Sequence, residues 1–340
     1  MGATALERQQ RRLRRLQETG VGRATVFVHD ECKFALDALR PYLVEARHVN
    51  LLQSFVAYVD REAARTGKDN GPQHGVFRYP GGKSWLIPEI KNWIVSSPRK
   101  PSLFVEPFAG GAIAGLTVAA EALSSRVFLS EIDDDVAAVW KTIFSERNAD
   151  VEWLCGRIQA FAVDSKAVND VLRIKPQTMR GRAFKAIVRN RMSRGGLMTD
   201  GAGLLKRGEN GNGLASRWYP ETLVARIRAL REIRHRVTFE QSDALEVISR
   251  FAADPDALYF IDPPYTAGGN HAGRRLYTHS EVDHEALFSQ TASVAGRALM
   301  TYHDVPEVRS LAERHGFEVR EVSMMTTHHK LQSELLILKL

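Results

Sequence analysis

The sequence predicts an α/β fold in which a mostly parallel β-sheet carries helices on both faces. Short apolar runs alternate with helix-forming segments over residues 76–145 and 236–340, a rhythm typical of parallel sheets. Turns rich in glycine or proline follow two of these runs, as at sheet edges that bind ligands. The chain has 340 residues, of which 44% are hydrophobic and 26% charged, which suits a globular protein with one large α/β domain and a smaller insertion.

The predicted elements follow one another along the chain. We expect strands at 102–105, 127–129, 237–240, 258–261 and 298–302. We expect helices at 112–123, 134–144, 244–252 and 283–294. Two final β-rich runs, 317–326 and 333–338, are expected to pair as an antiparallel hairpin at one edge of the sheet.

Two segments depart from this rhythm. Residues 146–235 are basic, helix-like at both ends and rich in glycine and asparagine over 195–213, which predicts a mainly helical insertion between the second and third strands. Residues 1–75 are predicted to form a basic helical extension, because 8–15 is an Arg-rich run with almost no apolar face. The extension could be a DNA arm, an interface for a partner protein or a solvated helix.

Composition and charge bound the class of protein. The net charge of +7 permits a polyanionic partner. Cys32 and Cys155 form no CxxC pair, so neither a zinc site nor a disulfide framework is indicated. No apolar run reaches the roughly 18 residues that span a bilayer, and no signal-peptide pattern follows the Arg-rich N-terminus. We therefore expect a cytoplasmic protein without a metal or a membrane anchor.

A glycine-rich turn and a later acidic residue predict a nucleoside site. Glycine lets the backbone turn tightly and lets a ligand approach main-chain N–H groups. About twenty residues after Gly110, Glu131 and Ile132 end the second strand, where a carboxylate can accept hydrogen bonds from both ribose hydroxyls. The turn lacks the GxGxxG pattern of NAD sites, which favours S-adenosylmethionine because that cofactor has no phosphate. The turn comprises Glu106, Pro107, Phe108, Ala109, Gly110 and Gly111.

The motif Asp262-Pro263-Pro264-Tyr265 follows an apolar strand and predicts a polar turn at the carboxyl edge of the sheet. The Asp262 carboxylate and the Pro263 carbonyl could each accept one hydrogen bond from an exocyclic amine such as N6 of adenine. Two such acceptors localise the nitrogen lone pair and stabilise the positive charge that grows during methyl transfer. The Tyr265 ring could stack on a base flipped out of a duplex.

Four segments together resemble the Dam-like, D12 class of N6-adenine DNA methyltransferases. In family order they are Phe77–Lys83, Phe104–Gly111, Ser130–Asp133 and Asp262–Tyr265. The resemblance covers about residues 76–340 and implies a Rossmann-like class I methyltransferase fold, S-adenosylmethionine as cofactor and double-stranded DNA as partner. It also implies that residues 146–235 recognise the target sequence.

The same resemblance implies roles for individual residues. Lys83 would lie near the target base, and Asp262 would border the cofactor as well as the base. His284 belongs to an Asp-His pair that the family often carries, and alternatively only caps or orients its helix. Cofactor contacts are implied for Tyr79, Gly81, Gly82, Lys83, Asp243 and Ala244.

An acid-free basic run in the insertion is the predicted DNA-binding surface. Arginine can neutralise phosphates and can bind guanine through two hydrogen bonds, although a solvated helix face would have the same composition. The run comprises Arg180, Arg182, Lys185, Arg189, Arg191 and Arg194. The glycines that follow would form a loop that becomes ordered on DNA.

Two further functions compete with adenine methylation in DNA. One is methylation of cytosine N4 or of an RNA base, because those amines need the same acceptors and ring. The other is a catalytically silent DNA-binding module, against which the intact Asp262 and Tyr265 argue. A restriction or defence partner protein is left open, and the insertion differs from that of members that read GATC.

Overall fold

The computed structural model describes residues 75–78, 82–97, 99–199, 203–205, 213–265, 282–325 and 331–340. The predicted N-terminal extension, Tyr79, Gly81 and much of the glycine-rich stretch lie outside the described residues. No helix in the described ranges is both long and apolar enough to cross a membrane.

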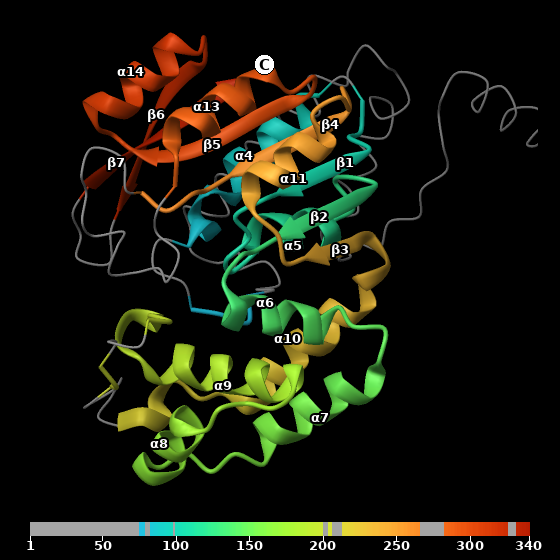
Figure 1. Cartoon of the computed structure of the whole chain (residues 1–340), viewed down its shortest axis with the longest axis vertical. Coiled ribbons are helices and arrows are strands. Elements are labelled where there is room, and N and C mark those ends of the chain that lie inside the picture. The colour runs from blue at the N-terminus through green and yellow to red at the C-terminus, as the bar shows by residue number, and fades with distance from the viewer. Residues whose placement is uncertain are drawn as a thin grey trace, which may run out of the picture. The chain divides into compact units, whose positions relative to one another are not determined.

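A seven-stranded sheet forms the centre of the fold, in the order β3-β2-β1-β4-β5-β7-β6 (Figure 1). Strands β1 to β5 are parallel, and β7 runs antiparallel to both β5 and β6. The strands are β1 (Leu103–Glu106), β2 (Arg126–Ser130), β3 (Val237–Glu240), β4 (Ala257–Ile261), β5 (Arg297–His303), β6 (Glu318–Met325) and β7 (Leu331–Lys339).

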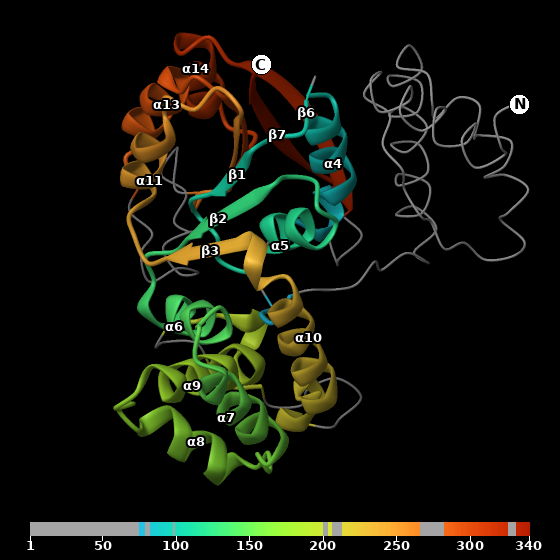
Figure 2. The ribbon, with the colours of Figure 1, turned by 90° about the vertical axis from the view of Figure 1, so that its right-hand side faces the viewer.

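Alternate residues of each strand supply two separate cores, because successive side chains of a strand point to opposite faces. Phe104 belongs to the core under α4 and α5, whereas Val105 belongs to the core under α11, α13 and α14. Figure 2 shows these two groups of helices on opposite faces of the sheet. The helices are α4 (Ile87–Val95), α5 (Ile113–Ala120), α11 (Ala244–Phe251), α13 (His284–Ser293) and α14 (Pro306–Arg314).

The insertion between β2 and β3 is helical, as the sequence predicts. After α6 (Asp134–Ile143), Leu154, Ile187 and Ile227 of the insertion pack into the same hydrophobic core as Val139 of α6. The insertion is therefore attached to the sheet through a continuous apolar core. Its elements are α7 (Asn148–Gln159), α8 (Ser165–Arg173), α9 (Met179–Met192), η5 (Arg194–Gly196), η7 (Gly213–Arg217) and α10 (Pro220–Glu232).

The predicted fold class is confirmed: the sheet is mostly parallel, helices cover both faces, and the C-terminal hairpin is antiparallel. The strand order and the antiparallel final strand agree with the fold that the sequence resemblance implies. Within the hairpin, the final strand β7 lies between β5 and β6, so β6 forms the outer edge. Helices α4 and α14 were not among the predicted elements.

Candidate active site

The Asp262 turn lies where the parallel strand β4 ends. Its two prolines are buried, while the Asp262 side chain remains 25% exposed. Ile261 pairs with Met300 of the neighbouring strand β5, so the next residue of β5, Thr301, lies beside Asp262. The Thr301 hydroxyl donates a hydrogen bond of 2.6 Å to Asp262 Oδ1. Strand register therefore helps to orient the carboxylate.

The two carboxylate oxygens of Asp262 differ in their polar contacts. In addition to the hydrogen bond from Thr301, Oδ1 accepts a hydrogen bond from the Tyr265 hydroxyl at 2.9 Å. It also forms an ion pair with Lys83 Nζ at 3.0 Å. Across the described part of the chain, no donor contacts Oδ2. The arrangement leaves Oδ2 available to accept a hydrogen bond from a substrate.

Aromatic neighbours hold the Tyr265 ring. Tyr302 stacks on it with 5.8 Å between centroids, and His303 approaches edge-on at 4.4 Å. Lys83 Nζ lies 4.9 Å from the ring centroid, within range of a cation–π interaction. Burial, followed by the charge of Asp262, raises the pKa of Tyr265 well above its ordinary value. Tyr265 therefore stays protonated and donates to Asp262.

His284 supports this cluster from α13. Its Nδ1 forms a 2.9 Å hydrogen bond with the hydroxyl of Tyr302, the ring that stacks on Tyr265. Burial lowers the pKa of His284, and the charges of Glu307 and Asp283 oppose that shift. His284 thus contacts Tyr302, the ring that stacks on Tyr265, whereas the cap of α13 comes from Asp283.

Glu131 joins the two segments predicted to bind a nucleoside. Its Oε2 accepts a 2.8 Å hydrogen bond from Gly110 N–H, and its Oε1 accepts from the N–H groups of Ile132 and Asp133, both at 2.9 Å. Burial raises the pKa of Glu131, which these backbone donors partly offset. Ile132 beside it is 42% exposed, an apolar side chain on which a flat ring could lie.

The remaining residues of the glycine motif divide by exposure. Gly110 has a φ of 46°, so a left-handed turn brings its partly exposed backbone over the carboxyl end of β1. Glu106 is instead buried, and its Oε2 accepts a 2.7 Å hydrogen bond from Gly115 N–H in the first turn of α5. Burial raises the pKa of Glu106 well above its ordinary value. Glu106 therefore stabilises the turn from the protein interior, where Pro107 and Ala109 are also buried.

Asp243 caps α11 at the end of the loop that follows β3. Its Oδ1 accepts a 2.8 Å hydrogen bond from Leu245 N–H, and the side chain is exposed. The following residue, Ala244, is buried. The carbonyl of the preceding Ser242 accepts a 2.9 Å bond from the Ser130 hydroxyl, which ties this loop to the end of β2. Asp243 therefore lies at the same sheet edge as Glu131, as the sequence predicts for a cofactor site.

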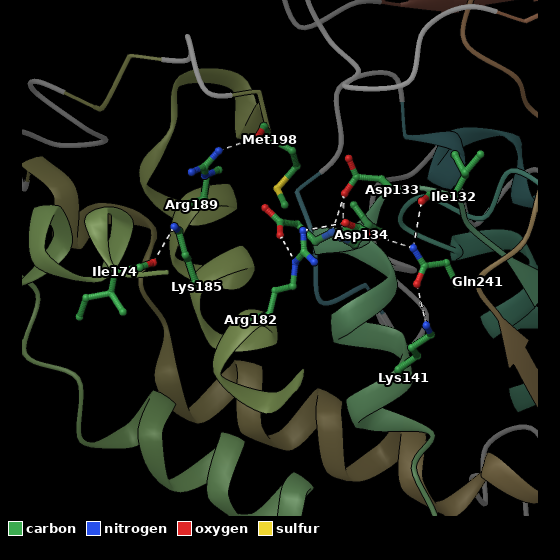
Figure 3. A network of polar contacts seen from close by, with 12 residues as sticks. Ile132, Asp133, Asp134, Lys141, Ile174, Arg182, Lys185, Arg189, Met198 and Gln241 are labelled. Carbon is green, nitrogen blue, oxygen red and sulfur yellow. Dashed lines mark hydrogen bonds and ion pairs between the residues drawn. The ribbon is translucent and has the colours of Figure 1, made fainter. Parts of the chain in front are cut away.

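The basic run of the insertion does not form one uniform surface. Figure 3 shows Arg182 of α9 reaching across to Asp134 of α6. The guanidinium pairs with Asp134 at 3.0 Å and with Asp135 at 2.6 Å. Lys185 donates to the carbonyl of Ile174 and Arg189 to that of Met198, as the same figure shows. These side chains brace the insertion as well as contributing charge.

Arg180, Arg191 and Arg194 differ in exposure. Arg180 pairs with Asp150 at 3.2 Å and remains partly exposed, and Arg194 is exposed. Arg191, in contrast, is buried, and its guanidinium donates to the carbonyl of Val76. Burial lowers the pKa of Arg191 to about 10. Its prediction as a DNA contact is corrected, because a side chain held inside the protein cannot reach a phosphate.

Polar residues of α9 and α10 form hydrogen bonds with the beginning of the first motif and with the chain just before it. Arg226 of α10 donates a 2.8 Å bond to the carbonyl of Gly75, and buried Asn190 of α9 bonds the main chain of Arg78. Gly196 packs so closely there that an added Cβ would lie 2.2 Å from the Arg78 carbonyl oxygen. Sequence reasoning missed these contacts, although an asparagine within an otherwise basic run was a visible signal.

Glu334 of β7 also belongs to the site and was not predicted. It is 1% exposed, and its Oε2 lies 3.8 Å from Lys83 Nζ. The sequence signal was an acidic residue directly before the apolar run 335–338. At the start of η4 (Lys83–Leu86), Lys83 is itself only 4% exposed, while Gly82 before it is exposed. Lys83 thus lies between two carboxylates.

Comparison with known protein families gives one match. The family model of the D12 class N6 adenine-specific DNA methyltransferases matches residues 79–168, which confirms the predicted resemblance over those residues and supports a methyltransferase. No curated protein matches the chain.

Three solved structures that match have low overall similarity. One is a Pyrococcus horikoshii protein provisionally described as an RNA methyltransferase, with 10% identity, a TM-score of 0.35, and coverage of 84% of this chain and 96% of that one. A precorrin-6y C5,15-methyltransferase from Geobacter metallireducens has 11% identity, a TM-score of 0.29, and coverage of 71% and 79%. The methyltransferase domain of a bacterial Hen1 protein has 8% identity, a TM-score of 0.30, and coverage of 71% and 91%.

Proposed function

We propose that this protein transfers the methyl group of S-adenosylmethionine to N6 of an adenine in double-stranded DNA. The observation that carries the proposal is the Asp262 carboxylate, whose Oδ1 is anchored by three donors while Oδ2 stays open. In this proposal residues 76–145 and 236–340 form the catalytic domain. Residues 146–235 recognise the target sequence.

The residues at the sheet edge fit the proposed cofactor. The partly exposed backbone at Gly110 allows close approach, and exposed Ile132 offers an apolar surface for the adenine ring. Glu131 retains lone pairs for ribose hydroxyls, since each carboxylate oxygen accepts more than one bond. Asp243 Oδ2 has no hydrogen-bond donor within the described ranges and could accept one from the adenine amine. When bound, S-adenosylmethionine would supply an electrophilic methyl group on a positively charged sulfur.

The chemical role of Asp262 follows from its geometry. A hydrogen bond from N6 to Oδ2, with a second to the carbonyl of Pro263, would draw the amine out of conjugation with the ring. Its lone pair would then point at the methyl carbon. The negative charge also stabilises the ammonium that forms on N6 before it loses a proton.

Base flipping and a basic surface complete the proposal. An adenine inside a duplex cannot reach a carboxylate that lies within the protein, so it must leave the stack, and the constrained Tyr265 ring is the candidate for holding it. Arg180, Lys185, Arg189 and the exposed Arg194 would contact the phosphates or bases of the flanking DNA.

Labelled S-adenosylmethionine incubated with the protein and mixed-sequence duplex DNA, followed by digestion to nucleosides, tests the proposal. Label in N6-methyl-2′-deoxyadenosine from DNA is the expected result. Label in N4-methyl-2′-deoxycytidine, or transfer only to RNA added in a parallel reaction, would instead identify the alternative substrates. Absence of transfer to any nucleic acid, while the protein still binds DNA, would indicate a catalytically silent module.

A further inference from the structure

Glu334 is a buried carboxylate that the mechanism above leaves unexplained. In the register of the sheet it pairs with His303 of β5 and with Val322 of β6, and its neighbours Leu335, Leu336 and Ile337 are buried. Its Oε2 is shielded from solvent and has no hydrogen-bond partner among the residues that the structure describes. An acidic group at such a place lowers stability unless it is paired, which makes a functional role a natural explanation.

The charged neighbours of Glu334 belong to the active-site cluster. Lys83 Nζ lies 3.8 Å from Oε2 and 3.0 Å from Asp262 Oδ1, so one ammonium faces two carboxylates. The charge of Glu334 also acts on Tyr265, and His303 lies opposite on the adjacent strand. The cluster therefore draws on four segments: η4, the Asp262 turn, β5 and β7.

The charge of this cluster bears directly on methyl transfer. Lys83 alone would cancel the negative charge of Asp262, although Asp262 must face an amine that becomes positive. If Glu334 is ionised, then Lys83, Asp262 and Glu334 together carry one net negative charge. Lys83 then interacts with both carboxylates and neutralises Asp262 only in part. Lys83 and Glu334 are buried, so water screens the interaction between their charges only weakly.

We propose that Glu334 is a positioning and charge-balancing residue for methyl transfer, which shares the Lys83 ammonium and so preserves the negative charge of Asp262 beside the target amine. This inference rests on the proposed function. It assigns Glu334 no contact with cofactor or base, and its effect passes through Lys83.

The protonation of Glu334 gives the inference a distinctive signature. Burial raises the pKa of Glu334 to about 7, Lys83 lowers it, and Asp262 raises it further. The other titratable neighbours behave differently: the pKa of His303 is lowered by burial, and that of Tyr265 is raised well above its ordinary value. Ionised Glu334 therefore predominates only above about pH 7.

The test compares the full-length wild type, Glu334→Gln and the control Glu318→Gln in single-turnover methylation from about pH 5.5 to about pH 8.5. Glu318 is an exposed carboxylate on the neighbouring strand β6 that pairs with Arg320. At the alkaline limit we expect Glu334→Gln to be about 10- to 100-fold slower, with cofactor affinity within a few-fold of the wild type. At the acid limit, where Glu334 is protonated, the two rates should converge, and the control should follow the wild type throughout.

A rate ratio that is the same at every pH, or a variant as fast as the wild type, would overturn the inference while leaving the proposed function intact. A wild type that methylates no DNA would instead remove the proposed function. A Lys83→Met background adds a second test: Glu334→Gln should there change the residual rate by less than about threefold, because no ammonium remains to be shared. An undiminished effect in that background contradicts the inference.

Discussion

Asn190 on α9 holds the main chain of Arg78, which lies 112 positions earlier in the sequence. The Asn190 Oδ1 accepts a 2.8 Å hydrogen bond from Arg78 N–H, and Nδ2 donates to the Arg78 carbonyl at 2.9 Å. The same Nδ2 donates to the carbonyl of Gly196 at 2.8 Å. The insertion is thus fastened to the main chain within the first motif, Phe77–Lys83.

Replacing Asn190 should disturb both stability and the first motif. Asn190→Asp keeps the shape but places a carboxylate oxygen against two buried carbonyls, so we expect a loss of about 2–4 kcal/mol in unfolding free energy. S-adenosylmethionine should also bind more weakly, because the first motif loses its anchor at Arg78. Denaturant unfolding and calorimetry measure the two effects. Asn169→Asp, on the exposed side of α8, is the control and should be near neutral in both.

Asp262 should be essential for the chemical step. Asp262→Asn replaces an acceptor by an NH2 group and removes the charge that stabilises the ammonium, so single-turnover transfer should fall by at least about 10²- to 10³-fold. Thr301→Val removes one donor to Oδ1 and should slow transfer about tenfold, because Lys83 and Tyr265 still hold the carboxylate. An Asp262→Asn rate within a few-fold of the wild type would mean that the Asp262 turn is structural.

Glu131 should control cofactor affinity. Glu131→Gln removes the charge and turns one acceptor into a donor that faces a backbone N–H, either at Gly110 or at Asp133. We expect S-adenosylmethionine binding to weaken by about 1.5–3 kcal/mol in calorimetry. Glu121→Gln, at the far end of α5, should bind normally. Equal affinities for the two variants would exclude Glu131 from the ribose site.

Glu334 should lower the stability of the protein at alkaline pH. Its pKa is raised from the ordinary 4.5 to about 7 in the folded state, so its contribution to stability is lost as pH rises through this range. The free energy of unfolding of Glu334→Gln should therefore equal that of the wild type at about pH 4.5. At about pH 8 the variant should be more stable by about 3 kcal/mol, since one pKa unit corresponds to about 1.4 kcal/mol. Denaturant unfolding at both pH values measures this. A variant less stable than the wild type at the higher pH would contradict the assigned shift.

Two arginines of the insertion that reach solvent should supply phosphate contacts. A double variant, Arg189→Gln with Arg194→Gln, should reduce the salt dependence of duplex DNA binding by about one unit of slope for each phosphate that is no longer neutralised. Fluorescence anisotropy at several salt concentrations measures the slope. Arg320→Gln on β6 is the control for a simple change in net charge. If the double variant, like the control, shows the wild-type slope and sequence preference, these two arginines are solvated surface residues that do not contact DNA.

The sequence alone determined the strands of the sheet, the glycine turn with Glu131, and the Asp262 turn. β3, for example, has the predicted bounds Val237–Glu240, and the Asp262 turn follows the apolar strand β4 as expected. Such features are local, because apolar period, glycine and proline restrict the backbone over a few residues. In a parallel sheet the carboxyl ends of the strands meet at one edge, so the motifs that follow β1, β2 and β4 could be grouped without coordinates.

Only the tertiary structure decided which side chains share an environment. Arg191 and Arg194 belong to the same basic run, yet Arg191 is buried against Val76 while Arg194 is exposed, because one face of α9 packs inward. Glu334 becomes a partner of Lys83 only because β7 lies beside β5, which brings together residues that are far apart in the sequence. Burial and charge pairing depend on such long-range contacts, and no local pattern encodes them.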